Sequence, residues 1–122
     1  MPSITFEVDP NVAAVATDYT SVVFMPANSA PNQWSGYIDG TSTGFWGLTG
    51  SKFAGTKCDI NGSRCTFSEL QAYLNDGGVG PKILTAAIVK GKDFFFSGAV
   101  DGLRINDTVV DFEETGITTT TP

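Results

Sequence analysis

The sequence contains no histidine among its 122 residues. Its absence excludes Ser-His-Asp and Cys-His nucleophilic machinery, the zinc hydrolase motifs and the commonest general base. The GGVGPK stretch lacks the spacing of a phosphate-binding loop and follows a predicted helix rather than a strand. Carboxylates are present, but no spacing singles out a pair suited to glycoside hydrolysis. We therefore expect a protein that is not an enzyme.

Charge is also scarce, since only 16% of the residues are charged and the formal net charge is −6. Seven Lys and Arg residues are too few to neutralise a phosphate backbone, so nucleic acid is not an expected partner. An acidic chain is likewise a poor binder of anionic membranes. No run approaches the ~18–20 apolar residues of a spanning helix, so membrane insertion is not expected.

The sequence has two cysteines, Cys58 and Cys65, which enclose the segment DINGSR. Asn61-Gly62 is a strong signal for a two-residue hairpin turn, and this turn would place Cys58 opposite Cys65. Opposed strand residues lie ~4.5–5.5 Å apart at Cα, within reach of a disulfide. We expect this disulfide and an extracellular or cell-surface location, with two free thiols as the alternative. No signal peptide is recognisable after Met1.

Among the residues present, 41% are hydrophobic, nine are Phe and 14 are Gly. This balance is typical of a turn-rich β protein built on rigid aromatic side chains. We expect one mainly β domain over residues 1–115, an antiparallel jelly-roll-like β-sandwich with one short α-helix. The Thr-rich segment 116–122 is expected to be a tail, a linker or a strand that pairs with a neighbouring subunit.

Local patterns predict the individual elements. Alternation and β-forming composition indicate strands at residues 3–8, 19–25, 34–38, 45–48 and 83–89. The second and the last of these are apolar on both faces, which indicates central strands. A helix is predicted after Thr66, because Thr66 and Glu69 form the capping-box pattern and Leu70, Tyr73 and Leu74 form an apolar stripe.

A closing hairpin is predicted near the end of the chain, with its turn at Asn106-Asp107. Side-chain alternation then gathers on one face the residues Leu103, Ile105, Thr108, Val110 and Phe112. Asp101 falls at the rim of this apolar face. We expect its carboxylate to accept backbone N–H bonds or, alternatively, to contact a ligand or cation.

Residues 97–113, SGAVDGLRINDTVVDFE, resemble the final strands of concanavalin A-like or laminin G-like jelly-roll modules of secreted bacterial proteins. The resemblance extends more weakly through WGLTG, TFSELQAYL and ILTAAIVKG. It implies a β-sandwich fold and sugar binding on aromatic platforms beside Asp, Asn and Gln side chains.

Aromatic residues in a polar, Gly-rich part of the chain supply such platforms. The predicted ligand-binding residues are Trp34, Tyr37, Asp39, Trp46 and Asp101. The alternative is that both Trp residues belong to the core. No cofactor is expected; Ca²⁺ remains an option through Asp59 and Asn61, whose spacing faintly resembles a calcium loop, or through Asp39 and Asp101.

These observations favour a non-catalytic extracellular binding module for carbohydrate or a cell-surface partner. The alternative is a structural subunit of a self-assembling surface layer, appendage or filament. In that case, homo-oligomers would form through the terminal strands.

Overall fold

The computed structural model describes residues 3–10, 19–26, 32–42, 44–75, 80–89, 102–113 and 116–120. One antiparallel sheet has the order β3-β2-β1-β4 and comprises β1 (Ser3–Asp9), β2 (Thr20–Phe24), β3 (Trp46–Leu48) and β4 (Lys82–Val89). A second has the order β5-β6-β7 and comprises β5 (Leu103–Ile105), β6 (Thr108–Glu113) and β7 (Gly116–Thr120). A single α-helix is described, α1 (Phe67–Leu74), with two short 3-10 turns, η1 (Gly40–Ser42) and η2 (Ser51–Phe53).

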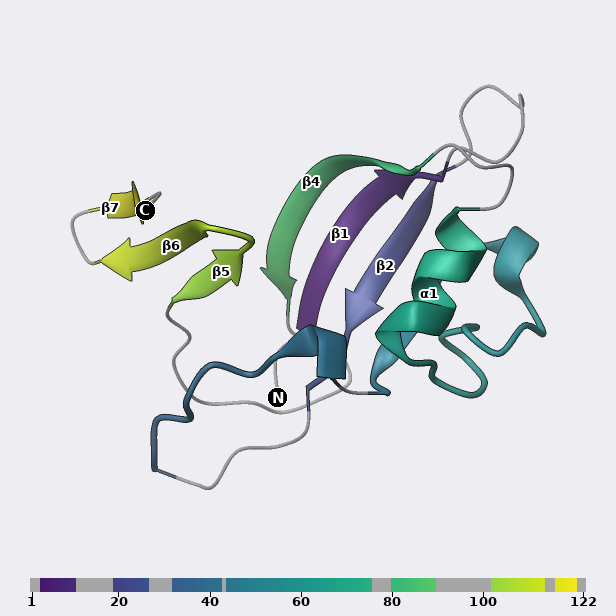
Figure 1. Ribbon diagram of the computed structural model, residues 1–122, viewed down its shortest axis with the longest axis horizontal. Helices are drawn as coiled ribbons and strands as arrows, with labels where there is room; N and C mark the ends of the chain where they lie inside the picture. The colour runs from purple at the N-terminus through teal and green to yellow at the C-terminus, as the bar shows by residue number, and fades with distance from the viewer. Residues whose placement is uncertain are drawn as a thin grey trace.

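The two sheets lie side by side in Figure 1, with the second sheet beyond the β4 edge of the first. The mainly β fold with one helix is confirmed. Stacking of two sheets into a sandwich stays a prediction.

The hydrophobic core lies between the four-stranded sheet and α1. Alternation along β1 turns Ile4, Phe6 and Val8 toward one face, where Phe6 pairs with Val22 of β2. The buried cluster consists of Val8, Val22, Phe24, Trp46, Leu48, Phe53, Cys58, Cys65, Leu70 and Leu74. β2 lies between β1 and β3, so its predicted central position is confirmed.

The helix begins where the capping pattern predicted. Thr66 Oγ1 accepts the N–H of Glu69 at 3.3 Å, and Glu69 Oε1 accepts the N–H of Thr66 at 3.4 Å. Both halves of the capping box are therefore formed. Leu70 and Leu74 are buried against the sheet, which confirms the apolar stripe. Glu69 also pairs with Lys57 at 2.7 Å and so connects the helix to the preceding loop.

Thr66→Ala is expected to lower the free energy of unfolding by about 1 kcal/mol, because a helix N-terminal N–H loses its acceptor. Chemical denaturation followed by circular dichroism measures this. Gln71→Ala is the matched control, since Gln71 is exposed on α1 and lies outside the capping box. Equal midpoints for the parent and Thr66→Ala would contradict the cap.

Among the described strands β4 lies at the edge of its sheet, whereas the sequence predicted a central strand over residues 83–89. Its Ile83 and Leu84 side chains are 58% and 43% exposed. The apolar character of both faces suggested burial, but β4 pairs with β1 beyond the reach of α1 (Figure 1). The register shifts between Glu7 and Val8, which marks a β-bulge in this pairing.

Residues 34–38 do not form the predicted strand. They follow Asn32, whose positive φ of 58° turns the chain, and they include Gly36. This segment runs as an exposed irregular loop instead. The neighbouring prediction holds, because β3 occupies Trp46–Leu48.

The closing hairpin has the predicted register: Leu103 pairs with Val110 and Ile105 pairs with Thr108. Asn106 takes a positive φ of 52°, as expected for a tight turn. The apolar face of this hairpin is half-buried. Asp101 lies outside the described residues.

The predicted tail is part of a sheet over most of its length. Gly116–Thr120 forms β7, which pairs antiparallel with β6 of the same chain. The boundary predicted at residue 115 therefore does not separate these residues from the folded part. Thr favours extended backbone, and β6 offers an edge that is adjacent in sequence.

Candidate functional site

The most exposed predicted site residues lie on one irregular segment, residues 32–39, which we call the aromatic loop. Trp34 is 70% exposed and Tyr37 is 68% exposed. Two large aromatic side chains exposed close together on one polar segment offer apolar surface for a contact. Trp34 and Tyr37 are three residues apart, and all residues between them are exposed.

The end of the aromatic loop is anchored by Asp39. Its Oδ1 accepts the N–H of Thr41 at 2.9 Å and the hydroxyl of Thr41 at 2.7 Å. These hydrogen bonds from Thr41 hold the pKa of Asp39 below its ordinary value, so the carboxylate is ionised at neutral pH. No hydrogen bond to Oδ2 comes from the described part of the chain. Sequence analysis missed Thr41, although the Asp-x-Thr pattern of an Asx turn predicts it.

The aromatic loop also contacts Gly102, the residue before β5, through Tyr37. A methyl group at Gly102 would lie 2.7 Å from Tyr37 Oη, so the tyrosine packs directly against this glycine. Gly102 has a positive φ of 68°, a conformation that favours glycine. Gly102 precedes β5 and follows Asp101, the predicted rim residue whose own position is not described.

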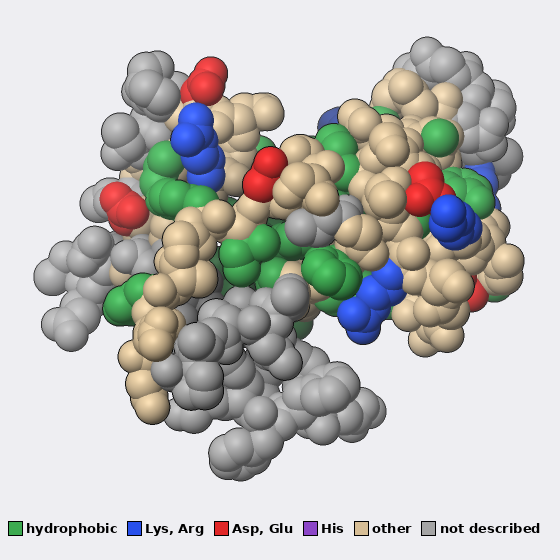
Figure 2. Space-filling view, turned by 60° about the horizontal axis from the view of Figure 1, so that its bottom comes forward, with side chains coloured by type: hydrophobic (Ala, Val, Ile, Leu, Met, Phe, Trp, Pro, Cys, Tyr) green, Lys and Arg blue, Asp and Glu red, His purple; other side chains and the backbone are tan. Residues whose placement is uncertain are grey.

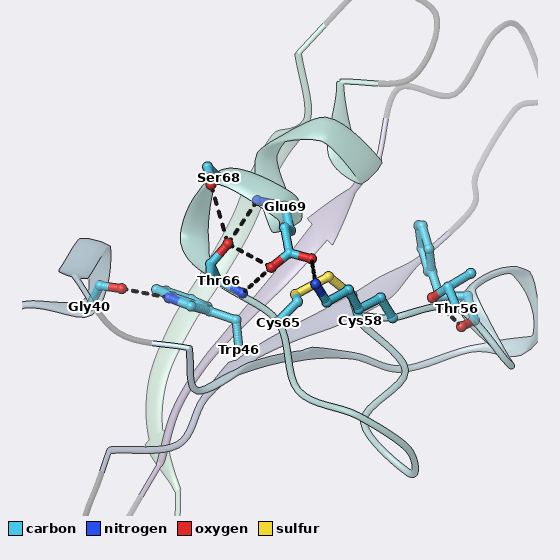
Figure 3. The surroundings of a disulfide bond; sticks show 10 residues. Gly40, Trp46, Thr56, Cys58, Cys65, Thr66, Ser68 and Glu69 are labelled. Carbon is cyan, nitrogen blue, oxygen red and sulfur yellow. Dashed lines mark hydrogen bonds and ion pairs between the residues drawn. A yellow bond between two sulfur atoms is a disulfide. The ribbon is translucent and has the colours of Figure 1, made fainter.

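Trp46 does not belong to this exposed surface and lies in the core, as the alternative prediction placed it. It is 7% exposed and packs its ring 5.0 Å from Phe24 and 5.5 Å from Phe67, measured between centroids. Its indole Nε1 donates to the carbonyl of Gly40 at 2.6 Å (Figure 3). Trp46 therefore ties the base of the aromatic loop to the core.

The predicted disulfide joins Cys58 and Cys65, with a Cα–Cα distance of 5.0 Å. Figure 3 shows it beside the capping residues of α1. Both cysteines bond to β3: Leu48 N–H donates to Cys58 O at 2.7 Å, and Cys65 N–H donates to Trp46 O at 2.9 Å. The disulfide loop thus covers the edge of β3, next to the Trp46 anchor.

The loop between the cysteines is not the predicted two-residue hairpin. Neither Asn61 nor Gly62 takes a positive φ. Instead Gly62 N–H donates to Asp59 O at 3.0 Å, which centres the turn one residue earlier. Pairing of Asp59 with Leu48 draws the chain toward β3 and away from a free hairpin.

The carboxylate of Asp59 is already used by the backbone. It accepts N–H groups from Gly55 and Asn61 at 2.9 and 3.0 Å, and these bonds lower the pKa of Asp59. Within the described ranges, no group of three or more His, Cys, Asp or Glu side chains is placed to hold a metal ion. Calcium binding through Asp59 and Asn61 therefore has no support in the geometry.

Other surface features are modest. A shallow hollow at the opposite end of β2 is lined by Pro10, Tyr19 and residues 49–53. Figure 2 shows charged side chains scattered over one face rather than collected into a patch of one sign. No helix in the described part of the chain is long and apolar enough to cross a membrane.

Comparison of the chain with protein-family models, with curated proteins and with solved structures finds no match. The similarity of residues 97–113 to jelly-roll modules stays a prediction.

Proposed function

We propose that this protein is a non-catalytic extracellular binding module that holds carbohydrate on the aromatic loop. The observation that carries the proposal is the exposure of Trp34 and Tyr37, 70% and 68%, on one short polar segment. Trp46, the third aromatic residue among the predicted site residues, is buried. The surface platform therefore consists of two aromatic residues and Asp39.

The chemistry of the aromatic loop suits a sugar. The C–H face of a pyranose can pack on an aromatic ring, and its hydroxyl groups need hydrogen-bond partners. Asp39 offers an ionised oxygen as acceptor. Asn32 and Gln33 are exposed, and their side-chain amides can both donate and accept hydrogen bonds. Residues 32–42 contain no Lys or Arg. Neutral sugars, or sugars with an amino group, are therefore favoured over sulfated or sialylated ones.

The disulfide is compatible with the extracellular part of this proposal, because such bonds persist in oxidising compartments. The jelly-roll-like sandwich belongs to the proposal as well. Strands β5 and β6 keep a half-buried apolar face that a sandwich partner would cover.

Trp34→Ala and Tyr37→Ala are each expected to weaken glycan binding by about tenfold or more, which corresponds to roughly 1.4 kcal/mol of lost packing. A glycan array identifies the neutral glycan, and calorimetry with that glycan measures the affinities. The matched control is Tyr19→Ala, because Tyr19 is 66% exposed but lies at the start of β2, away from the aromatic loop. An array without binding, or equal losses for Tyr19→Ala, would contradict the proposal.

One observation favours a second function, that of a structural subunit in a surface assembly. β4 exposes Ile83, Leu84 and Val89, which are unusually apolar for a solvent-facing edge strand. The β-bulge in β4 opposes simple edge-to-edge pairing, since bulges disrupt the ladder. Light scattering separates the two functions: a monomer at high concentration supports the binding module, and large assemblies support the subunit.

A further inference from the structure

Two exposed turns each present an asparagine followed, two residues later, by a hydroxyl side chain. One is Asn61-Gly62-Ser63 in the disulfide loop, and the other is Asn106-Asp107-Thr108 in the β5–β6 turn. This spacing, without proline in the middle, is the acceptor pattern for N-linked glycosylation. The pattern alone is common in proteins. Exposure of the asparagine and the hydrogen bonds of its side chain decide whether a glycan can be attached.

In the disulfide loop, Asn61, Gly62 and Ser63 are all exposed. The backbone N–H of Asn61 donates to Asp59 Oδ1, which holds the turn without using the Asn61 side chain. The side-chain amide of Asn61 makes no hydrogen bond to a described residue. A group attached at Nδ2 would therefore extend into solvent without displacing an internal contact.

The β5–β6 turn presents Asn106 in the same way. Asn106 is exposed at the tip of the hairpin. Its backbone carbonyl accepts a hydrogen bond from the Nε–H of Arg104 at 3.0 Å. This bond holds the turn through the backbone, and the Asn106 side-chain amide again has no described partner. Thr108, which supplies the hydroxyl, begins β6 directly after the turn.

We propose that Asn61 and Asn106 are acceptor sites for N-linked oligosaccharides. In this transfer, Nδ2 of the asparagine forms a bond to C1 of the first sugar and loses a proton. The bond from C1 to the pyrophosphate of a polyprenyl-pyrophosphate oligosaccharide donor breaks, and the pyrophosphate leaves with the electron pair. A membrane transferase of the secretory pathway recognises the hydroxyl at the second position after the acceptor. Disulfide formation needs the same oxidising route, so the two modifications are mutually consistent.

This inference rests on the extracellular setting of the proposed function, but it does not depend on sugar binding by the aromatic loop. Asn61 and Asn106 lie outside that loop, and attached glycans would be modifications rather than ligands. Loss of glycan binding in Trp34→Ala would leave both attached glycans in place, so the two proposals fail separately.

The test is secretion of the full chain from cultured eukaryotic cells behind a cleavable signal peptide. Intact mass is recorded before and after treatment with an amidase that releases N-linked glycans and converts each acceptor to Asp. Two glycans are expected on the folded, disulfide-bonded protein. Asn61→Gln, Ser63→Ala, Asn106→Gln and Thr108→Ala should each remove one glycan.

Asn75→Gln is the matched control, because Asn75 is exposed but is followed by Asp76 and Gly77 and lacks the hydroxyl. It should keep both glycans. Acceptor residues are modified as the chain enters the secretory pathway, before folding is complete, so the folded protein must accommodate the glycans. The melting temperature before and after glycan release tests this. An unchanged melting temperature is expected from the exposure of both turns. Unmodified Asn61 or Asn106 in the secreted protein, or loss of folding with the glycan attached, would overturn the assignment of that site.

Discussion

Trp46→Ala is expected to lower the free energy of unfolding by about 3–5 kcal/mol, the usual cost of truncating a large buried aromatic residue. The indole ring packs against Phe24 of β2 and Phe67 of α1, so its removal opens a cavity between the sheet and the helix. The substitution also leaves the Gly40 carbonyl without its indole donor. Urea denaturation followed by circular dichroism measures the loss.

Trp34→Ala is the matched control for this experiment, since the sequence contains only these two Trp residues. Trp34 is 70% exposed, and its truncation should change stability by no more than about 0.5 kcal/mol. Trp46→Phe keeps an aromatic ring but loses the hydrogen bond to Gly40, so its stability should fall between the two. Similar losses for Trp34→Ala and Trp46→Ala would contradict the division between core and surface.

The second large effect concerns the disulfide. Replacing both cysteines in the Cys58→Ala, Cys65→Ala variant is expected to cost about 2–4 kcal/mol. The bond restricts the unfolded chain, and in the folded state it keeps two strand-like segments paired with β3. Without the disulfide, the loop of residues 59–64 is no longer held closed. The backbone hydrogen bonds of Cys58 and Cys65 to β3 are then weakened. Thermal unfolding of the parent and of the double variant gives the difference.

Native alkylation provides the control for the disulfide. Cys58 and Cys65 are 0% and 1% exposed, so a small reductant and an alkylating agent should modify them only once denaturant opens the fold. Intact mass then changes sharply at the denaturation midpoint. Rapid alkylation without reductant in native buffer would show free thiols and would remove the support for an extracellular setting.

Local patterns predicted three features well. The capping box at Thr66 depends on residues three positions apart, and the Cys58–Cys65 bridge spans seven positions. The closing hairpin depends on alternation around one turn, and its register followed from that alternation. In each case the interacting groups are close in sequence, so little of the chain has to be known to place them.

Predictions failed where the answer depends on distant neighbours. The apolar segment 83–89 indicated a central strand, yet among the described strands it pairs with β1 alone and lies beyond the reach of α1. The Asn61-Gly62 turn failed because Cys58 and Ile60 form backbone hydrogen bonds to Leu48 of β3, a partner ten or more residues away. Propensity describes what a segment prefers alone, and long-range pairing overrides a preference of this size.

The two tryptophans show the same division within the candidate site. The order of residues alone predicted the class of fold, the helix cap and the cysteine pair. It also showed the polar, aromatic character of residues 32–46. Which indole meets solvent could not be read from that order, because Trp34 and Trp46 occur in similar local surroundings. Pairing of Trp46 with Phe24 and the packing of α1 over it bury one ring, while Trp34 lies on a segment with no strand partner. Burial is a property of the assembled neighbours, and these come together only when the chain folds.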